Sequence, residues 1–144
     1  MFICDTMLGK LARWLRILGY DTIYARGEDR DIVAEAQREG RVLLTRDKEL
    51  ASKGFLIKTF SVEEQLKELL DAGLIEVREE KMMTRCPLCN SLLKPVEKES
   101  ARGKVPEKSF ESSDSFWYCE QCKKYYWIGK HWIDIKKRID RLTQ

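Results

Sequence analysis

The sequence predicts an α/β protein: a domain with a mainly parallel sheet, then a small cysteine-rich module and a C-terminal helix. Short apolar runs alternate with amphipathic helical segments as far as residue 73, which is typical of parallel strands joined by right-handed helical crossovers. Four of the five cysteines form two Cys-x-x-Cys pairs in the second half of the chain. Beyond these pairs, apolar residues in 131–142 recur at helical spacing.

The first part of the chain divides into elements at its polar and glycine residues. Strands are expected at 2–4, 22–24, 42–45 and 56–58. Helices are expected at 8–18, at 29–39, after a capping box formed by Ser61 and Glu64, and as a short turn at 47–52. Residues 74–83 are expected to form a connector or a further strand, and we place the domain boundary between 1–81 and 82–144.

Composition excludes several classes of protein. The chain has 144 residues, 43% hydrophobic and 35% charged, too apolar for a disordered chain. No apolar run approaches the roughly 18 residues that a membrane span needs, and Asp5 interrupts the region where a signal peptide would be apolar. We therefore expect a cytoplasmic protein without a membrane partner. Residues 1–83 carry a net charge of −2 and residues 84–144 one of +5, so the second part is the better candidate for contact with a polyanion.

The paired cysteines predict a structural zinc site. Cys86 and Cys89 form one pair, Cys119 and Cys122 the other, and 29 residues separate the pairs. Two residues between thiolates allow a tight turn that directs both sulfurs at one tetrahedral ion. A redox dithiol and disulfides are the alternatives, and both are less favoured in a chain without a secretion signal. Cys4 lies in an expected buried strand and needs no redox role.

Residues 94–115 are expected to form a mobile loop between the two cysteine pairs. The segment is polar and contains two prolines, one glycine and five serines, a composition typical of turns and loops.

Three aspartates follow expected strands and suggest a second metal site. Asp5 follows the first strand, Asp29 the second and Asp47 the third, and ligands bind at the carboxyl edge of open parallel sheets. Converging carboxylates favour Mg²⁺ or Mn²⁺, which would activate water and stabilise a leaving oxygen in phosphodiester hydrolysis. Helix capping is the alternative role of all three. Nearby acids that could substitute or add a ligand are Glu28, Asp31 and Glu49.

Two segments carry a family resemblance. The segment from Asp5 to Gly19, DTMLGKLARWLRILG, and the segment from Gly40 to Asp47, GRVLLTRD, resemble the Mut-seven C-terminal RNase-domain family. The cysteine segments RCPLCN and CEQCKKYYWIGKH match its zinc-ribbon portion, in the same order along the chain. The resemblance implies a PIN-like nuclease domain at 1–81, a zinc ribbon at 82–144, and Asp5, Asp29 and Asp47 as the catalytic acids.

Basic and aromatic residues are candidates for RNA contact. They are Arg13, Arg16, Arg46, Lys123 and Lys124. The alternative for Arg13 and Arg16 is a solvated helix face. Five aromatic residues of the ribbon could stack bases or form its core, and we favour core for at least half: Trp117, Tyr118, Tyr125, Tyr126 and Trp127. His131 is the only histidine, and no role is assigned to it.

Two functions remain open from the sequence. The first is a Mg²⁺- or Mn²⁺-dependent ribonuclease whose zinc ribbon helps to bind RNA. The alternative is a non-catalytic adaptor that binds RNA, the ribosome or a protein partner, with the aspartates as helix caps. A homodimer and a protein inhibitor are further candidate assemblies.

Overall fold

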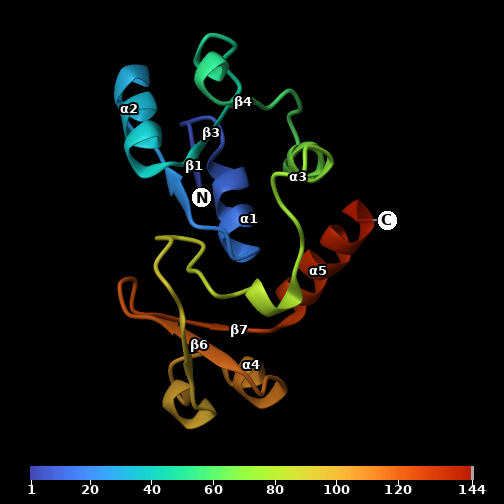
Figure 1. The fold of residues 1–144 in the computed structure, drawn as a ribbon. Coiled ribbons are helices and arrows are strands. Elements are labelled where there is room, and N and C mark those ends of the chain that lie inside the picture. Colours follow the sequence, from blue (N-terminus) through green and yellow to red (C-terminus); the bar gives the residue numbers. More distant parts are fainter. Residues whose placement is uncertain (144) are drawn as a thin grey trace. The chain divides into compact units, whose positions relative to one another are not determined.

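The computed structural model describes residues 1–143, with only the backbone of 131 and 132. The chain consists of two compact units, Met1–Asn90 and Ser91–Gln144. Each is described by itself below (Figure 1).

The first unit contains a four-stranded parallel sheet, as predicted. Its strands are β1 (Phe2–Cys4), β2 (Thr22–Tyr24), β3 (Val42–Thr45) and β4 (Phe55–Leu56), in the order β2-β1-β3-β4. In register, Cys4 lies opposite Tyr24 on one side and Leu44 on the other. The carboxyl ends of β1, β2 and β3 therefore lie at one edge of the sheet.

Three helices cover the two faces of this sheet: α1 (Gly9–Ile17), α2 (Asp29–Glu39) and α3 (Val62–Asp71). Ile32 and Ala36 of α2 pack with Ile3 and Leu43 of the sheet in a buried apolar cluster. On the other face, α1 contacts α3 and buries Leu11 and Leu15. The unit thus has three layers.

Local chemistry explains where the helices begin and end. Ser61 caps α3 by accepting a hydrogen bond from the backbone N–H of Glu64, as the capping box predicts. Gly40 ends α2 in the left-handed conformation, with φ of 66°, which costs glycine less than other residues. Gly19 follows α1 with φ of 97°, and a Cβ there would lie 2.2 Å from the carbonyl oxygen of Lys81.

Two expectations for this unit need correction, and one pair of alternatives is decided. The strand expected at 56–58 is β4, Phe55–Leu56. Ile57 still donates to β3, but the next N–H on that side, that of Thr59, donates to the Glu68 carboxylate instead of continuing the ladder. The short helix expected at 47–52 is the 3₁₀ turn η1 (Leu50–Lys53). At 74–83 the expected connector is found and not the alternative strand: the segment contains the 3₁₀ turn η2 (Glu79–Lys81).

The second unit contains a three-stranded antiparallel sheet, β5 (Lys94–Val96), β6 (Phe116–Cys119) and β7 (Lys124–Trp127), followed by α5 (Lys130–Leu142). The helix expected at 131–142 is confirmed. The mobile loop expected at 94–115 is wrong: it contains β5, the 3₁₀ turn η3 (Lys98–Ala101) and α4 (Glu107–Ser112). Sparse apolar residues hold it, since Ala101 is fully buried and Phe110 packs 6.0 Å from the ring of Phe116.

None of the helices described is both long enough and apolar enough to cross a membrane.

Candidate functional site

Asp5 lies at the carboxyl end of the central strand β1 and is only 6% exposed. One carboxylate oxygen accepts a hydrogen bond from the backbone N–H of Met7, 3.1 Å away. The other accepts the hydroxyl of Thr45, a fully buried residue at the end of β3. Both bonds stabilise the carboxylate against the cost of burial. Asp5 is therefore held in a fixed position at the sheet edge.

Asp47 lies on the same edge, two residues beyond β3. Its backbone N–H donates to the hydroxyl of Thr45, 3.0 Å away. One hydroxyl thus contacts both acids: it donates to the Asp5 side chain and accepts from the Asp47 backbone. The Asp47 side chain is exposed and accepts from the N–H groups of Glu49 and Leu50 at 2.8 and 3.4 Å, as a cap of the following turn does. The role of Thr45 was not predicted, although its place at the end of a strand, two residues before an acid in LLTRD, is a signal.

Asp29 is the first residue of α2 and is exposed to solvent. Glu28 precedes it as the N-cap residue, and neither residue shows a side-chain cap hydrogen bond. An acid in the first turn is also favourable to the helix dipole. Asp47 therefore caps its turn by hydrogen bonds, as the alternative role predicts. Asp29 contributes to its helix only through its charge.

The three aspartates share an edge without forming a close cluster. Within the described residues, the one group of three or more acids, cysteines or histidines whose ligand atoms all lie within 4.8 Å of one another is the cysteine group. Asp5, Asp29 and Asp47 as joint ligands therefore remain a prediction. Cys4, next to Asp5, is fully buried. Burial, and secondarily the charge of Asp5, raises the pKa of its thiol to about 12, so Cys4 stays neutral in the core.

The four paired cysteines do form a close cluster. The sulfur atoms of Cys86, Cys89, Cys119 and Cys122 all lie within 4.8 Å of one another. Sulfurs bound to one zinc ion at about 2.3 Å would be about 3.8 Å apart in a tetrahedron, so the donor set fits such an ion. Cys86 and Cys119 are fully buried, and Cys89 and Cys122 are partly so.

Both cysteine pairs adopt the same turn. The N–H of Asn90 donates to the carbonyl oxygen of Cys86 at 2.9 Å, and the N–H of Lys123 donates to that of Cys119 at 2.8 Å. Asn90 and Lys123 both have positive φ, 73° and 57°. The N–H of Cys122 also points to the sulfur of Cys119, 3.3 Å away. This repeated turn presents two sulfurs on one side, which is the geometry that the Cys-x-x-Cys spacing predicts.

Arg16 holds the first of these turns against the parallel sheet. Its guanidinium donates to the carbonyl oxygens of Thr22, Pro87 and Leu88, at 2.8, 3.0 and 3.2 Å. The residue is only 7% exposed. Burial lowers the pKa of Arg16, while the neighbouring thiols and Asp21 oppose that effect. The structure thus gives this predicted RNA-binding residue a place inside the fold, and its contact with RNA remains untested.

Asp21 anchors the same turn at the amino edge of the sheet. Its carboxylate accepts from Arg41 and Asn90, each at 2.8 Å, and lies 3.7 Å from Arg85. Burial alone would raise the pKa of Asp21, but the hydrogen bonds from Arg41 and Asn90 outweigh it and lower the pKa. The side-chain oxygen of Asn90 in turn accepts from the N–H of Thr22 at 3.0 Å.

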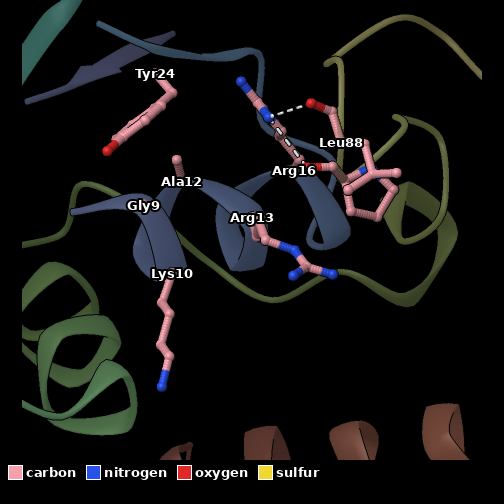
Figure 2. Close-up of a pocket in the computed structure, with 8 residues that line it drawn as sticks. Gly9, Lys10, Ala12, Arg13, Arg16, Tyr24 and Leu88 are labelled. Atoms are coloured by element: carbon pink, nitrogen blue, oxygen red, sulfur yellow. Dashed lines mark hydrogen bonds between the residues drawn. The ribbon is translucent and has the colours of Figure 1, made fainter. Parts of the chain in front are cut away.

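A shallow pocket of about 330 Å³ lies along α1. Figure 2 shows Arg16 turned toward the loop at Leu88, whereas the charged groups of Lys10 and Arg13 extend away from the helix. Tyr24 closes the end nearest the acids, since its hydroxyl donates to the carbonyl of Thr6, 2.5 Å away. Arg13 is exposed. The pocket is therefore lined by exposed cations and by a tyrosine that is bonded to the residue after Asp5.

Arg46 lies between Thr45 and Asp47 in the chain, directly after β3. Its guanidinium donates to the carbonyl of Thr59 and lies 3.8 Å from the ring centre of Phe60. Phe60 is 86% exposed. Arg46 was predicted from the sequence as a candidate for RNA contact, but Phe60 was not. Its one indication in the sequence is an aromatic residue in a polar turn before the capping box.

The ribbon cations Lys123 and Lys124 are both exposed. Lys124 begins β7, opposite Cys119, so its position follows from the cysteine turn. The five ribbon aromatic residues named from the sequence are all half-buried, and a sixth in the same two strands, Phe116, is buried. The rings of Tyr118 and Tyr125 pack 4.7 Å apart. The side chain of His131 lies outside the described residues.

Taken together, these features define a class: a parallel α/β domain with acids after neighbouring strands, in a chain that also carries a four-cysteine cluster of the kind that holds structural zinc. The family model of the Mut7-C RNAse domain matches residues 1–139. The chain belongs to this family, which confirms the resemblance of its motifs, and it carries a ribonuclease domain. Comparisons with curated proteins and with solved structures gave no match.

Proposed function

We propose that this chain is a Mg²⁺- or Mn²⁺-dependent ribonuclease that hydrolyses RNA phosphodiester bonds at the carboxyl edge of its parallel sheet. The observation that carries the proposal is the coupling of Asp5 and Asp47 through Thr45, in a chain that belongs to an RNase-domain family. The expected products carry a 5′-phosphate and a 3′-hydroxyl.

The acids would have different tasks. Asp5 is buried and fixed by two hydrogen bonds, so it would hold an ion at a constant position. Asp47 and Asp29 are exposed and would complete the ligand set from either side of β1. Mg²⁺ or Mn²⁺ bound by these carboxylates would supply a Lewis acid and an activated water. Thr45 would keep the Asp5 carboxylate oriented.

Basic side chains would hold the RNA on either side of the acids. Arg13 lines the pocket along α1, and Arg46 lies beside Asp47. Lys123 and Lys124 of the ribbon are exposed and would add contacts to the phosphates. Arg16 would contribute indirectly, because it holds the loop at Leu88 that lines the same pocket.

The four cysteines would bind one structural zinc ion per chain. The shared turn of the two pairs and the spacing of their sulfurs support this part of the proposal. A metal assay of purified protein should give about one zinc per chain. Absence of zinc from protein with intact thiols would contradict it.

Cleavage of labelled single-stranded RNA in the presence of Mn²⁺ tests the proposed activity. We expect Asp5→Asn and Asp47→Asn each to abolish most of the cleavage, because an amide is a neutral and weaker ligand for a hard cation. Unchanged cleavage by both variants would contradict the proposed site.

The alternative is an adaptor that binds RNA, the ribosome or a protein partner without cleaving RNA. The observation that favours it is the capping role of Asp47, whose carboxylate accepts two backbone N–H groups of its own turn. Mn²⁺ at millimolar concentration should raise the melting temperature of the protein if the aspartates bind the ion. If they serve only as helix caps, the melting temperature should not change. A melting curve that responds to RNA and not to Mn²⁺ would favour the adaptor.

A further inference from the structure

Phe60 is the most exposed large apolar side chain among the described residues, at 86%. Single exposed apolar residues are common on protein surfaces, so exposure by itself indicates nothing. Its surroundings are what distinguish Phe60: a rigid backbone, a cation against its ring, and a position at the same edge as the acids.

The backbone before Phe60 is fixed by α3. The Glu68 carboxylate accepts from the N–H groups of Lys58 and Thr59 and from the Thr59 hydroxyl, at 3.0 to 3.1 Å and 2.6 Å. The carbonyl of Thr59 accepts from the buried side chain of Gln65 at 3.0 Å. An ordered backbone lowers the entropy cost of using the next side chain as a binding surface.

Arg46 lies against the ring of Phe60. Its guanidinium carbon is 3.8 Å from the ring centre, and the same group donates to the carbonyl of Thr59. A guanidinium at this distance both orients the ring and places positive charge beside it. Arginine has five N–H donors, so donors remain for a phosphate oxygen. The pair therefore combines an aromatic surface with a phosphate-binding group.

Topology places this pair next to the acids. Phe60 follows β4, which pairs in parallel with β3, and Ile57 still donates to the carbonyl of Thr45 at 2.7 Å. Arg46 is covalently next to Asp47. The order β1-β3-β4 thus brings Asp5, Asp47 and the segment carrying Phe60 to successive strand ends of one edge.

We propose that Phe60, supported by Arg46, is a base-stacking residue that positions a nucleobase of single-stranded RNA beside the acidic edge. The inference rests on the proposed function and names a residue that holds its substrate. Stacking on an aromatic ring tolerates any base, because every base has a π face. Phe60 would therefore contribute affinity for unpaired RNA without a strong sequence preference.

Binding of the full-length chain to two labelled strands tests this proposal. One is oligouridylate of about 12 nucleotides, and the other is a ribose-phosphate strand of equal length without bases. Fluorescence anisotropy is measured without added divalent cations, so that cleavage does not interfere. We expect Phe60→Ala to weaken oligouridylate binding about 5- to 100-fold and to leave binding of the baseless strand unchanged.

Two variants serve as controls. Phe60→Trp should retain affinity for oligouridylate. The tryptophan fluorescence that the variant has in excess of the wild type should be quenched when oligouridylate binds. Leu92→Ala removes another apolar side chain, 69% exposed and outside the parallel sheet, and should bind as the wild type does. The melting temperature of Phe60→Ala should match the wild type, since its ring is exposed.

Wild-type affinity of Phe60→Ala for oligouridylate, or an equal loss on the baseless strand, would overturn the proposal. Loss of self-association in Phe60→Ala with unchanged RNA affinity would also overturn it and would assign the ring to a second copy of the chain. These outcomes would not change what the cleavage assays of Asp5→Asn and Asp47→Asn show about the acidic site. Conversely, normal cleavage by Asp5→Asn and Asp47→Asn with weak RNA binding by Phe60→Ala would reject the acidic site alone.

Discussion

The two edges of the parallel sheet use charged residues in opposite ways. At the amino edge, Asp21 is bonded to Arg41 and Asn90, and the Arg41 side chain is only 8% exposed. At the carboxyl edge, Asp47 is exposed and Phe60 projects into solvent. The amino edge pairs its charges within the fold, whereas the carboxyl edge leaves a carboxylate and an aromatic ring accessible.

This difference separates stability from function. A paired, buried charge is costly to disrupt because its partner is left without a counter-charge. The exposed Asp47 carboxylate is available to an ion or a substrate, and asparagine can replace it as the cap of its turn. Substitution of Asp21 at the amino edge should therefore lower the stability of the protein, and substitution of Asp47 at the carboxyl edge should lower its activity.

The largest expected effect contrasts Asp47→Asn with Asp21→Asn. Asp47→Asn should lower RNA cleavage more than about 100-fold, since ion coordination contributes several kcal/mol to the transition state, with little change in melting temperature. Asp21→Asn should lower the melting temperature and preserve cleavage by the folded fraction. Cleavage rates and thermal melts of both variants make the comparison. Loss of stability in Asp47→Asn with full activity would reverse the assignment of the two edges.

A second contrast concerns two arginines of α1. Arg16→Met should destabilise the protein by about 2 kcal/mol, because the carbonyls of Thr22, Pro87 and Leu88 lose their donor. Arg13→Met should leave stability unchanged, since Arg13 is exposed, and should weaken RNA binding. Urea denaturation and anisotropy measure the two effects. Equal stability of Arg16→Met and the wild type would show that these hydrogen bonds are dispensable.

The smallest expected effect is a pH dependence at the segment before Phe60. Burial would raise the pKa of Glu68, but hydrogen bonds from Thr59 and from backbone N–H groups outweigh it and lower the pKa. The unfolded chain then binds the proton more readily. The stabilisation is present above about pH 4.5, the ordinary value for this group, and is lost as the pH falls through the lowered pKa.

Glu68→Gln checks this dependence. Its melting temperature should fall less steeply than that of the wild type below about pH 4.5. Asp21 has a lowered pKa as well and contributes in the same direction in both proteins. Identical acid-melting curves would show that the Glu68 carboxylate does not stabilise this segment.

The sequence predicts those features that depend on local chemistry. Short apolar runs located the strands, and the Cys-x-x-Cys spacing located the two cysteine turns, because neighbours in the chain determine both. Features that depend on distant partners were not predictable. Arg16 is buried because the loop at Leu88, 72 residues away in the chain, accepts its hydrogen bond. Likewise, β4 is short because Glu68 accepts the Thr59 N–H, which would otherwise extend the ladder with β3.

Mn²⁺ binding measured by electron paramagnetic resonance tests the claim that Asp5 and Asp47 bind a divalent ion at the carboxyl edge. The signal of free Mn²⁺ should fall on addition of the wild type and of Asp21→Asn, and should persist with the double variant Asp5→Asn, Asp47→Asn. Binding by the double variant equal to that of the wild type would contradict the claim.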